Sequence, residues 1–154
     1  MGFETLANPE VLKFLDTQRV CVFAIEMPDG SPHASTVHFA SLGTEPIFMF
    51  ETSRRYRKAE ALFYRLQSRA SLAAGFEEGS NSKTLQVDGV AELVTNNDPL
   101  MSDYLKKFPE KVKKLEDPNI IFFKFIPTWW QFTDWSRPEG KTVYLSDGSV
   151  TIGT

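Results

Sequence analysis

Short runs of β-forming residues, separated by proline and glycine turns, follow one another along most of this 154-residue chain. The clearest turn is Pro28-Asp29-Gly30-Ser31, in which proline presets the backbone angle φ and glycine accepts a left-handed conformation. It joins residues 19–27 to residues 32–42, so these two runs are predicted to form a β-hairpin. Strands joined by such short turns are antiparallel, which argues against a parallel α/β sheet with long helical crossovers.

Further strand candidates continue this pattern to the end of the chain. They cover residues 47–52, 70–77, 84–95, 119–126 and 128–135, with a closing hairpin at 141–146 and 149–152. Gly89 is predicted to mark a β-bulge. Many short antiparallel strands with few helices favour a barrel, because closure removes exposed strand edges. We therefore expect residues 1–154 to form a single, mainly β domain, a β-barrel with a few helices.

Helices are predicted at two points in the first half of the chain. Asn8 followed by Pro9 is typical of a helix start, because asparagine caps the free N–H groups and proline fits the first turn. Ser53 is predicted to cap a second helix directly after the strand at residues 47–52. One apolar face of this second helix is predicted to consist of Tyr56, Ala59, Phe63 and Leu66.

A third helix is predicted to begin at Asp98-Pro99 and to be interrupted at Pro109. Its lysines are predicted to form a solvated face, which is the ordinary place for lysine on a helix. These lysines are Lys106, Lys107, Lys111, Lys113 and Lys114.

Composition narrows the classes of function. The 17 Lys and Arg residues against 20 Asp and Glu give a net charge of −3, which argues against a nucleic-acid-binding protein. Cys21 is the only cysteine, so an internal disulfide and a thiolate zinc site are excluded. Residues 1–6 contain an early acid, and the longest purely apolar run, 20–25, is too short to span a bilayer. We expect a cytoplasmic protein with no membrane or nucleic-acid partner.

The two histidines do not indicate a metal site. His33 and His38 lie five residues apart in one predicted strand, so their side chains face opposite sides of it. Neither has a second histidine or a cysteine at ligand spacing, and no metal is expected. We predict that His38 is a core or rim histidine held by a hydrogen bond. Nucleotide-binding glycine loops, the serine-hydrolase elbow and the HExxH motif are all absent from the sequence.

A basic run after the third strand predicts an anion site. Thr52 and Ser53 precede four cationic residues within five positions, Arg54, Arg55, Arg57 and Lys58. Free N–H groups and the positive end of the helix dipole attract phosphate to a helix N-terminus. The neighbouring strand, residues 32–42, has polar side chains on both faces, and a flat ring could lie along its backbone.

Several segments occur in an order that is similar to a known family. They are residues 29–37, the strand end Phe50-Glu51-Thr52-Ser53, Lys58 one turn into the helix, and residues 86–92. Together they resemble the pyridoxamine 5'-phosphate oxidase-like flavin-binding split barrels over residues 8–135. The resemblance implies an antiparallel split β-barrel that forms a homodimer and binds FMN at the subunit interface.

The resemblance also implies a set of cofactor-binding residues. Some of these residues would line the flavin ring, others would contact its phosphate, and two belong to later strands. The full set is His33, Ser35, Thr36, Val37, Thr52, Ser53, Arg57, Lys58, Gln86 and Trp130. Trp130, or its neighbours Trp129 and Phe132, would reach the partner's flavin, with core or interface packing as the favoured alternative for these aromatic residues. The chain has no C-terminal Arg-Trp or Arg-Leu segment, so oxidation of vitamin B6 is not expected.

We thus expect an FMN-dependent oxidoreductase that acts on a small molecule, and no residue is identified as catalytic. One alternative is a deazaflavin (F420) reductase, whose acidic cofactor tail would suit Arg54, Arg55 and Arg57. Another is a non-catalytic flavin- or haem-binding split barrel. Haem would need an axial ligand, and His33 and His38 are the two histidines in the chain.

Overall fold

An antiparallel sheet forms the body of the molecule in the computed structural model, which describes residues 8–41, 47–76, 82–95 and 97–153. Its strands are β1 (Val20–Glu26), β2 (Pro32–Ser41), β3 (Phe48–Ser53), β4 (Ser68–Phe76), β5 (Lys83–Val94), β6 (Ile120–Asp134), β7 (Thr142–Leu145) and β8 (Val150–Ile152). Their order is β3-β2-β1-β4-β5-β6-β7-β8, and β3 also pairs with β6. That extra pairing closes β1 to β6 into a barrel, which confirms the predicted mainly β fold.

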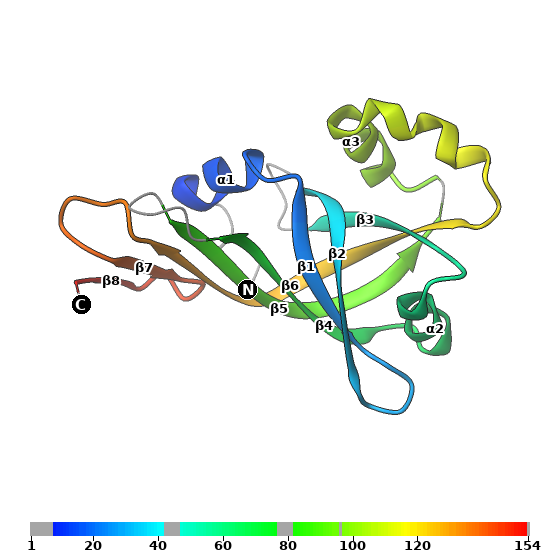
Figure 1. The fold of residues 1–154 in the computed structure, drawn as a ribbon, viewed down its shortest axis with the longest axis horizontal. Helices are drawn as coiled ribbons and strands as arrows, with labels where there is room; N and C mark the ends of the chain where they lie inside the picture. Colours follow the sequence, from blue (N-terminus) through cyan, green and yellow to red (C-terminus); the bar gives the residue numbers. More distant parts are fainter. Residues whose placement is uncertain (1–7, 42–46, 77–81, 96, 154) are drawn as a thin grey trace.

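Four helical segments accompany the barrel in the described part of the chain. They are α1 (Pro9–Asp16), α2 (Arg57–Tyr64), α3 (Leu100–Lys107) and the 3-10 helix η3 (Pro109–Glu116). The α3 helix lies at one end of the molecule and the β7–β8 hairpin at the other (Figure 1). Within the described ranges no helix is long and apolar enough to cross a membrane. Residues 1–6, which entered the expectation of a cytoplasmic protein, lie outside the described residues.

Phenylalanine rings fill the barrel interior. Side chains alternate between buried and more exposed along β1, as the two-residue period of a strand requires. The fully buried rings of the main core are Phe23, Phe39, Phe48, Phe50, Phe123, Phe125 and Phe132. Phe50 and Phe123 stack with 5.0 Å between ring centroids, which joins β3 to β6 across the closure of the barrel.

A second, smaller apolar cluster lies on the outer face of the barrel, between the strands and α3. Its buried members are Ala40, Met49, Met101, Tyr104, Phe108 and Phe122. Phe108 lies at the junction of α3 and η3, so this packing also fixes where η3 begins. The 3-10 helix is thereby held over the outer side of β3.

The predicted bulge at Gly89 is confirmed. Asp88 pairs with Trp129 and Gly89 with Pro127, which leaves Thr128 as the extra residue of β6. A Cβ atom on Gly89 would lie 2.2 Å from the carbonyl oxygen of Ile126, so only glycine fits this close approach. The sequence analysis predicted two strands joined at Pro127, but β6 is continuous, because a bulge tolerates the missing N–H of proline.

The predicted helix cap at Ser53 is wrong. Ser53 is the last residue of β3, and the backbone N–H of Arg54 donates to the carbonyl of Asn119 at 2.7 Å, which continues the ladder toward β6. The Oγ atom of Ser53 accepts from the N–H of Arg55, and the helix begins only at Arg57. A long-range strand contact has therefore displaced the local capping preference.

The predicted apolar face of α2 is also largely wrong. Its buried residues are Lys58, Ala59, Ala61 and Leu62. Tyr56, Phe63 and Leu66 are exposed. The side of the helix that meets the barrel is thus the one that contains Lys58.

Candidate functional site

The site begins where β2 and β3 part. Their pairing ends at Phe39 and Phe50, although both strands continue beyond these residues. The next three rungs of the same register would join His38 to Glu51, Val37 to Thr52 and Thr36 to Ser53. All six of these residues line a pocket of about 170 Å³ instead. Backbone groups on this side of each strand are left facing the pocket rather than a neighbouring strand.

Three further elements close the pocket. Tyr56 and Lys58 come from the start of α2, Lys111 and Lys114 come from η3, and Ile120 comes from the first residue of β6. The pocket therefore has three lysines and one carboxylate, that of Glu51, around a small polar space. This charge balance favours an anionic ligand.

Lys58 is the most unusual group in the pocket. The residue is only 6% exposed, and its Nζ atom lies 5.2 Å from the centroid of the Tyr56 ring. No carboxylate or other hydrogen-bond acceptor among the described residues pairs with its ammonium. Burial lowers the pKa of Lys58, because the charged form loses its hydration. A buried cation in this situation is a ready partner for a bound anion.

Two buried hydroxyls in the same region also lack partners. The Oγ1 atom of Thr52 and the Oγ atom of Ser35 are buried with no hydrogen-bond partner within the described structure. Thr52 lines the pocket beside Lys58. Buried polar atoms are nearly always hydrogen-bonded in folded proteins, so an unsatisfied hydroxyl next to an unpaired ammonium fits a ligand with several acceptor oxygens. A phosphate group meets this requirement.

The other two lysines are held by Glu51. Its Oε1 atom accepts from Lys111 Nζ and from Lys114 Nζ, each at 2.7 Å, and the side chains of Glu51 and Lys111 are 9% and 7% exposed. Lys111 also donates to the hydroxyl of Tyr104 at 3.1 Å. The prediction that the lysines of this region form a solvated face is therefore wrong for Lys111, because its partners lie on β2, β3 and α3.

His38 lies at the rim of the pocket, as predicted, and it is held by a hydrogen bond. Its Nδ1 atom is 3.2 Å from Lys111 Nζ, and its ring lies 5.5 Å from that of Phe108. Desolvation and the nearby charges of Lys111 and Arg19 lower the pKa of His38. The imidazole is therefore neutral at neutral pH.

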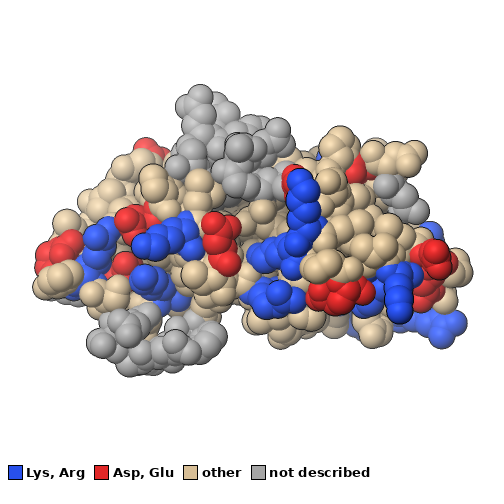
Figure 2. Space-filling view, turned by 90° about the horizontal axis from the view of Figure 1, so that it is seen from above, with Lys and Arg blue, Asp and Glu red and all other residues tan. Residues whose placement is uncertain are grey.

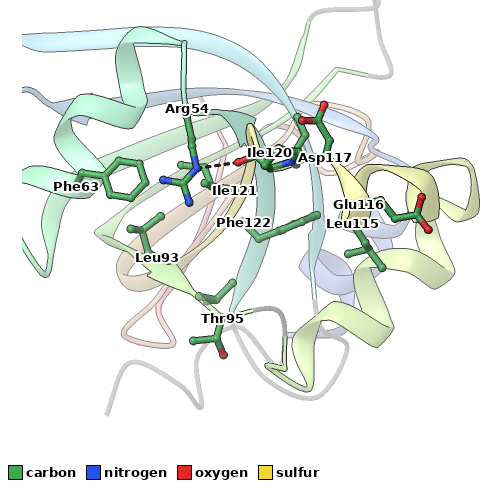
Figure 3. Close-up of a pocket in the computed structure, with 12 residues that line it drawn as sticks. Arg54, Phe63, Leu93, Thr95, Leu115, Glu116, Asp117, Ile120, Ile121 and Phe122 are labelled. Carbon is green, nitrogen blue, oxygen red and sulfur yellow. Dashed lines mark hydrogen bonds between the residues drawn. The ribbon is translucent and has the colours of Figure 1, made fainter.

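The basic run around α2 does not gather in one place. Arg54 turns into a second pocket, of about 420 Å³, where its Nε atom donates to the carbonyl of Pro118 at 3.0 Å. Its guanidinium also lies over the ring of Phe63, 4.9 Å from the centroid. Figure 3 shows Arg54 and Phe63 on one side of this pocket and Leu115 on the other. Arg55 and Arg57 are exposed. Of the four cations, Lys58 alone lines the pocket between β2 and β3.

The remaining predicted site residues lie elsewhere in the protomer. His33 is half-buried on β2, opposite Ile25 and outside the pocket lining. Gln86 is exposed on β5, paired with Gln131 of β6. Trp130 is 2% exposed within the main core, which is the packing alternative favoured for it. Whether Gln86 and Trp130 contact a cofactor stays a prediction.

Six residues of the pocket lining were not among the predicted site residues: Glu51, Lys111, Lys114, His38, Tyr56 and Ile120. A signal existed for Glu51, which is a charged residue in an otherwise apolar strand. The lysines of η3 carried no such signal, because exposed and buried lysines look alike in a sequence. Surface charge is mixed on the face shown in Figure 2, where Lys and Arg are interspersed with Asp and Glu. The described residues contain no cluster of His, Cys, Asp and Glu suited to a metal ion.

A closed antiparallel barrel whose strands part over a lysine-lined pocket defines a split-barrel protein. The chain belongs to the pyridoxamine 5'-phosphate oxidase family, whose sequence profile matches residues 7–134. No curated protein sequence matches it.

Solved structures of the same fold include proteins that bind different groups. A haem-binding protein from Mycobacterium smegmatis has a TM-score of 0.69 and 14% identity, covering 92% of this chain and 58% of that chain. HutZ, the haem storage protein from Vibrio cholerae, has a TM-score of 0.60 and 18% identity, covering 79% and 90%. A pyridoxamine 5'-phosphate oxidase-related, FMN-binding protein from Nostoc punctiforme has a TM-score of 0.61 and 15% identity, covering 98% and 93%. At these identities the likeness shows the fold alone.

Proposed function

We propose that this protein binds FMN and acts as a flavin-dependent oxidoreductase on a small organic molecule. The observation that carries the proposal is the largely buried Lys58, whose ammonium has no hydrogen-bond or ion-pair partner among the described residues, in one pocket with the buried, unpartnered hydroxyl of Thr52. Lys58, Thr52 and Ser53 would hold the phosphate, and the exposed Arg57 lies one residue away at the start of α2. The likeness to an FMN-binding protein supports this assignment.

The division of work between cofactor and protein follows from the pocket. A bound flavin would supply hydride or one-electron chemistry. The chain would bind the phosphate, orient the cofactor along the unpaired edge of β2 at Thr36 and Val37, and exclude water from the buried part of the pocket. We propose that the protein works as a homodimer, since Gln86 and the exposed Trp129 lie away from the pocket of their own protomer.

A titration of the purified protein with FMN, followed by flavin fluorescence, tests the phosphate assignment. We expect Lys58→Met to weaken FMN binding about ten- to a hundredfold, since a hydrogen bond to a charged group contributes about 1.5–3 kcal/mol. Riboflavin lacks the phosphate and should bind the variant and the unmodified protein alike. Lys113→Met, at an exposed lysine of η3 outside the pocket, is the matched control. Equal FMN affinity in the Lys58 and Lys113 variants would show that the phosphate lies elsewhere.

Haem binding is the second candidate, because two proteins of this fold are described as haem proteins and His38 lies at the pocket rim. It requires a ligand to the iron, and the chain has two histidines, His33 and His38. The F420 alternative is supported less, since Arg54 is already engaged by Pro118 and Phe63. Parallel titrations with haemin and F420 separate these candidates from FMN.

A further inference from the structure

The η3 helix buries a charged side chain and exposes apolar ones, which is the reverse of the usual arrangement. Lys111 is its only buried residue, whereas Val112 and Leu115 are 51% and 36% exposed. Burying a lysine ammonium is unfavourable unless its donors are all satisfied, and leaving apolar side chains in water gains nothing. An element that buries its lysine in preference to its apolar residues is therefore organised around the contacts of that lysine.

Those contacts use every donor of the ammonium. Lys111 Nζ lies 2.7 Å from Glu51 Oε1, 3.1 Å from the Tyr104 hydroxyl oxygen and 3.2 Å from His38 Nδ1. An ammonium carries three N–H donors and has no lone pair. It cannot accept a hydrogen bond from His38, so the Nδ1 atom of His38 must accept. The proton of the neutral imidazole is consequently on Nε2.

The surrounding charges keep the ring in this neutral form. Desolvation and the charges of Lys111, Arg19 and Lys114 disfavour protonation of His38. The carboxylate of Glu51 favours protonation, but its effect is smaller than that of desolvation or of Lys111. Glu51 is itself shared between the two lysines through Oε1. The rim of the pocket therefore presents a neutral imidazole with one defined N–H donor.

We propose that Lys111 is a positioning residue that fixes His38 as an Nε2–H donor to an oxygen of the bound phosphate ester, and that His38 is not a ligand to haem iron. Coordination of iron through Nε2 needs a lone pair on that atom and the proton on Nδ1, which would then face the Lys111 ammonium. The ligand named here rests on the proposed FMN function, whereas the tautomer rests on the contacts of Lys111 alone.

Nitrogen-15 NMR of the histidine rings tests the tautomer without any ligand. At pH 7 the His38 ring should show a protonated Nε2 and an unprotonated Nδ1, with its signals identified by their loss in His38→Gln. Lys111→Met should return the ring to the mixture of both tautomers seen in free histidine, while Lys113→Met should not. A wild-type ring protonated on Nδ1, alone or together with Nε2, would overturn the proposal. The wild-type spectrum decides this even where Lys111→Met fails to fold.

Titration with FMN tests the donor role. His38→Met removes the donor and should weaken FMN binding about three- to tenfold, the loss of one hydrogen bond. His38→Gln keeps an amide N–H near the position of Nε2 and should restore most of that affinity. Unchanged affinity in His38→Met would refute the donor role. If the unmodified protein fails to bind FMN, the proposed function is wrong. The tautomer of His38 is still decided by the NMR experiment, which uses no ligand.

Titration with haemin tests whether His38 coordinates haem iron. The absorption spectrum of the haemin-loaded protein should be the same for the unmodified chain and His38→Leu, because His38 does not coordinate the iron; leucine is used since methionine can itself bind haem iron. Lys111→Leu should release the ring and allow a histidine-ligated spectrum that disappears in the double variant with His38→Leu. Loss of a histidine-ligated spectrum in the single variant His38→Leu would contradict the inference.

Discussion

Two lysines of one pocket are buried in different ways. Lys111 has three hydrogen-bond partners, among them Glu51, whereas the ammonium of Lys58 has no hydrogen-bond or ion-pair partner among the described residues and lies over the ring of Tyr56. A buried charge without a partner destabilises the fold, and it is tolerated where a ligand later neutralises it. The free energy of unfolding of the ligand-free protein therefore indicates which lysine lacks a partner until a ligand binds.

Lys58→Met is expected to stabilise the ligand-free protein. Replacing this unpaired ammonium of a largely buried lysine with an apolar side chain of similar length should raise the free energy of unfolding by about 1 kcal/mol. Urea denaturation of both proteins measures the difference. Saturating FMN should reverse the order, because ligand binding stabilises the unmodified protein more than the variant. A variant less stable than the unmodified protein without ligand would indicate that Lys58 has a partner in the fold.

The titration of His38 should appear in the pH dependence of stability. Desolvation and the charges of Lys111, Arg19 and Lys114 lower its pKa in the folded state, while Glu51 opposes them. The unfolded chain therefore takes up a proton on this ring before the folded chain does. Above about pH 6.5, the ordinary pKa of histidine, the ring is neutral in both states and does not lower the free energy of unfolding. As the pH falls below that value toward the lowered pKa, the unfolded chain is protonated first and the free energy of unfolding decreases.

Urea denaturation at pH 5 to 8 measures this dependence. His38→Gln cannot titrate, so its free energy of unfolding should fall less between pH 7 and pH 5 than that of the unmodified protein. His33→Gln is the control, since His33 lies outside this cluster. Parallel curves for the unmodified protein and His38→Gln would show that the ring has the same pKa in the folded and unfolded states.

At the scale of elements, local signals predicted well those structures that depend on local contacts. The cap at Asn8 is one of them, since its Oδ1 atom accepts from the N–H of Glu10 at 2.9 Å. The hairpin of β1 and β2 is another. The boundary between β3 and α2 was predicted wrongly, because the bond from Arg54 to Asn119 joins residues far apart in sequence. Asn8 and Ser53 have a similar local preference for capping a helix, so the sequence alone could not distinguish the two cases.

The bulge between β5 and β6 yields a prediction at this scale. Gly89→Ala would place a Cβ atom 2.2 Å from the carbonyl oxygen of Ile126 and 2.9 Å from the ring of Phe125. Backbone has to move to relieve this contact, so the variant should lose about 1–3 kcal/mol of stability. Thr128→Ala, at the exposed extra residue of the same bulge, should cost less than about 0.5 kcal/mol. Urea denaturation of the two variants compares them, and equal losses would mean that the close approach is easily relieved.

At the scale of the whole molecule, the pocket is a product of topology. The opening arises where β2 and β3 stop pairing while β3 remains joined to β6, and α3 then holds η3 across it. The family resemblance predicted the barrel and placed Thr52, Ser53 and Lys58 together, as the structure does. It could not predict Lys111, which is 60 residues from Glu51 and 73 from His38 in sequence. Such contacts follow from the folded arrangement and have no local pattern.

The last prediction concerns assembly. Gln86 lies in register with Ala73 and Val22 and, through them, with Thr36 of the pocket. Three strand spacings, about 14 Å, therefore separate Gln86 from Thr36, which is more than a glutamine side chain spans. If Gln86 contacts FMN, we expect it to do so from the partner in a homodimer. Lys58→Met and Gln86→Ala should then each weaken FMN binding when present in both protomers.

Hybrid dimers made from the two variants test this arrangement. In a hybrid, one cofactor site has both defects, whereas the other combines the intact Lys58 of one protomer with the intact Gln86 of its partner. We therefore expect one site of unmodified affinity per hybrid, measured by FMN titration after co-expression and separation with two affinity tags. If both residues served the same protomer's site, each site of the hybrid would carry one defect and no high-affinity binding would return. Recovery of one site would thus locate the cofactor between the subunits, where residues distant in one barrel become neighbours through symmetry.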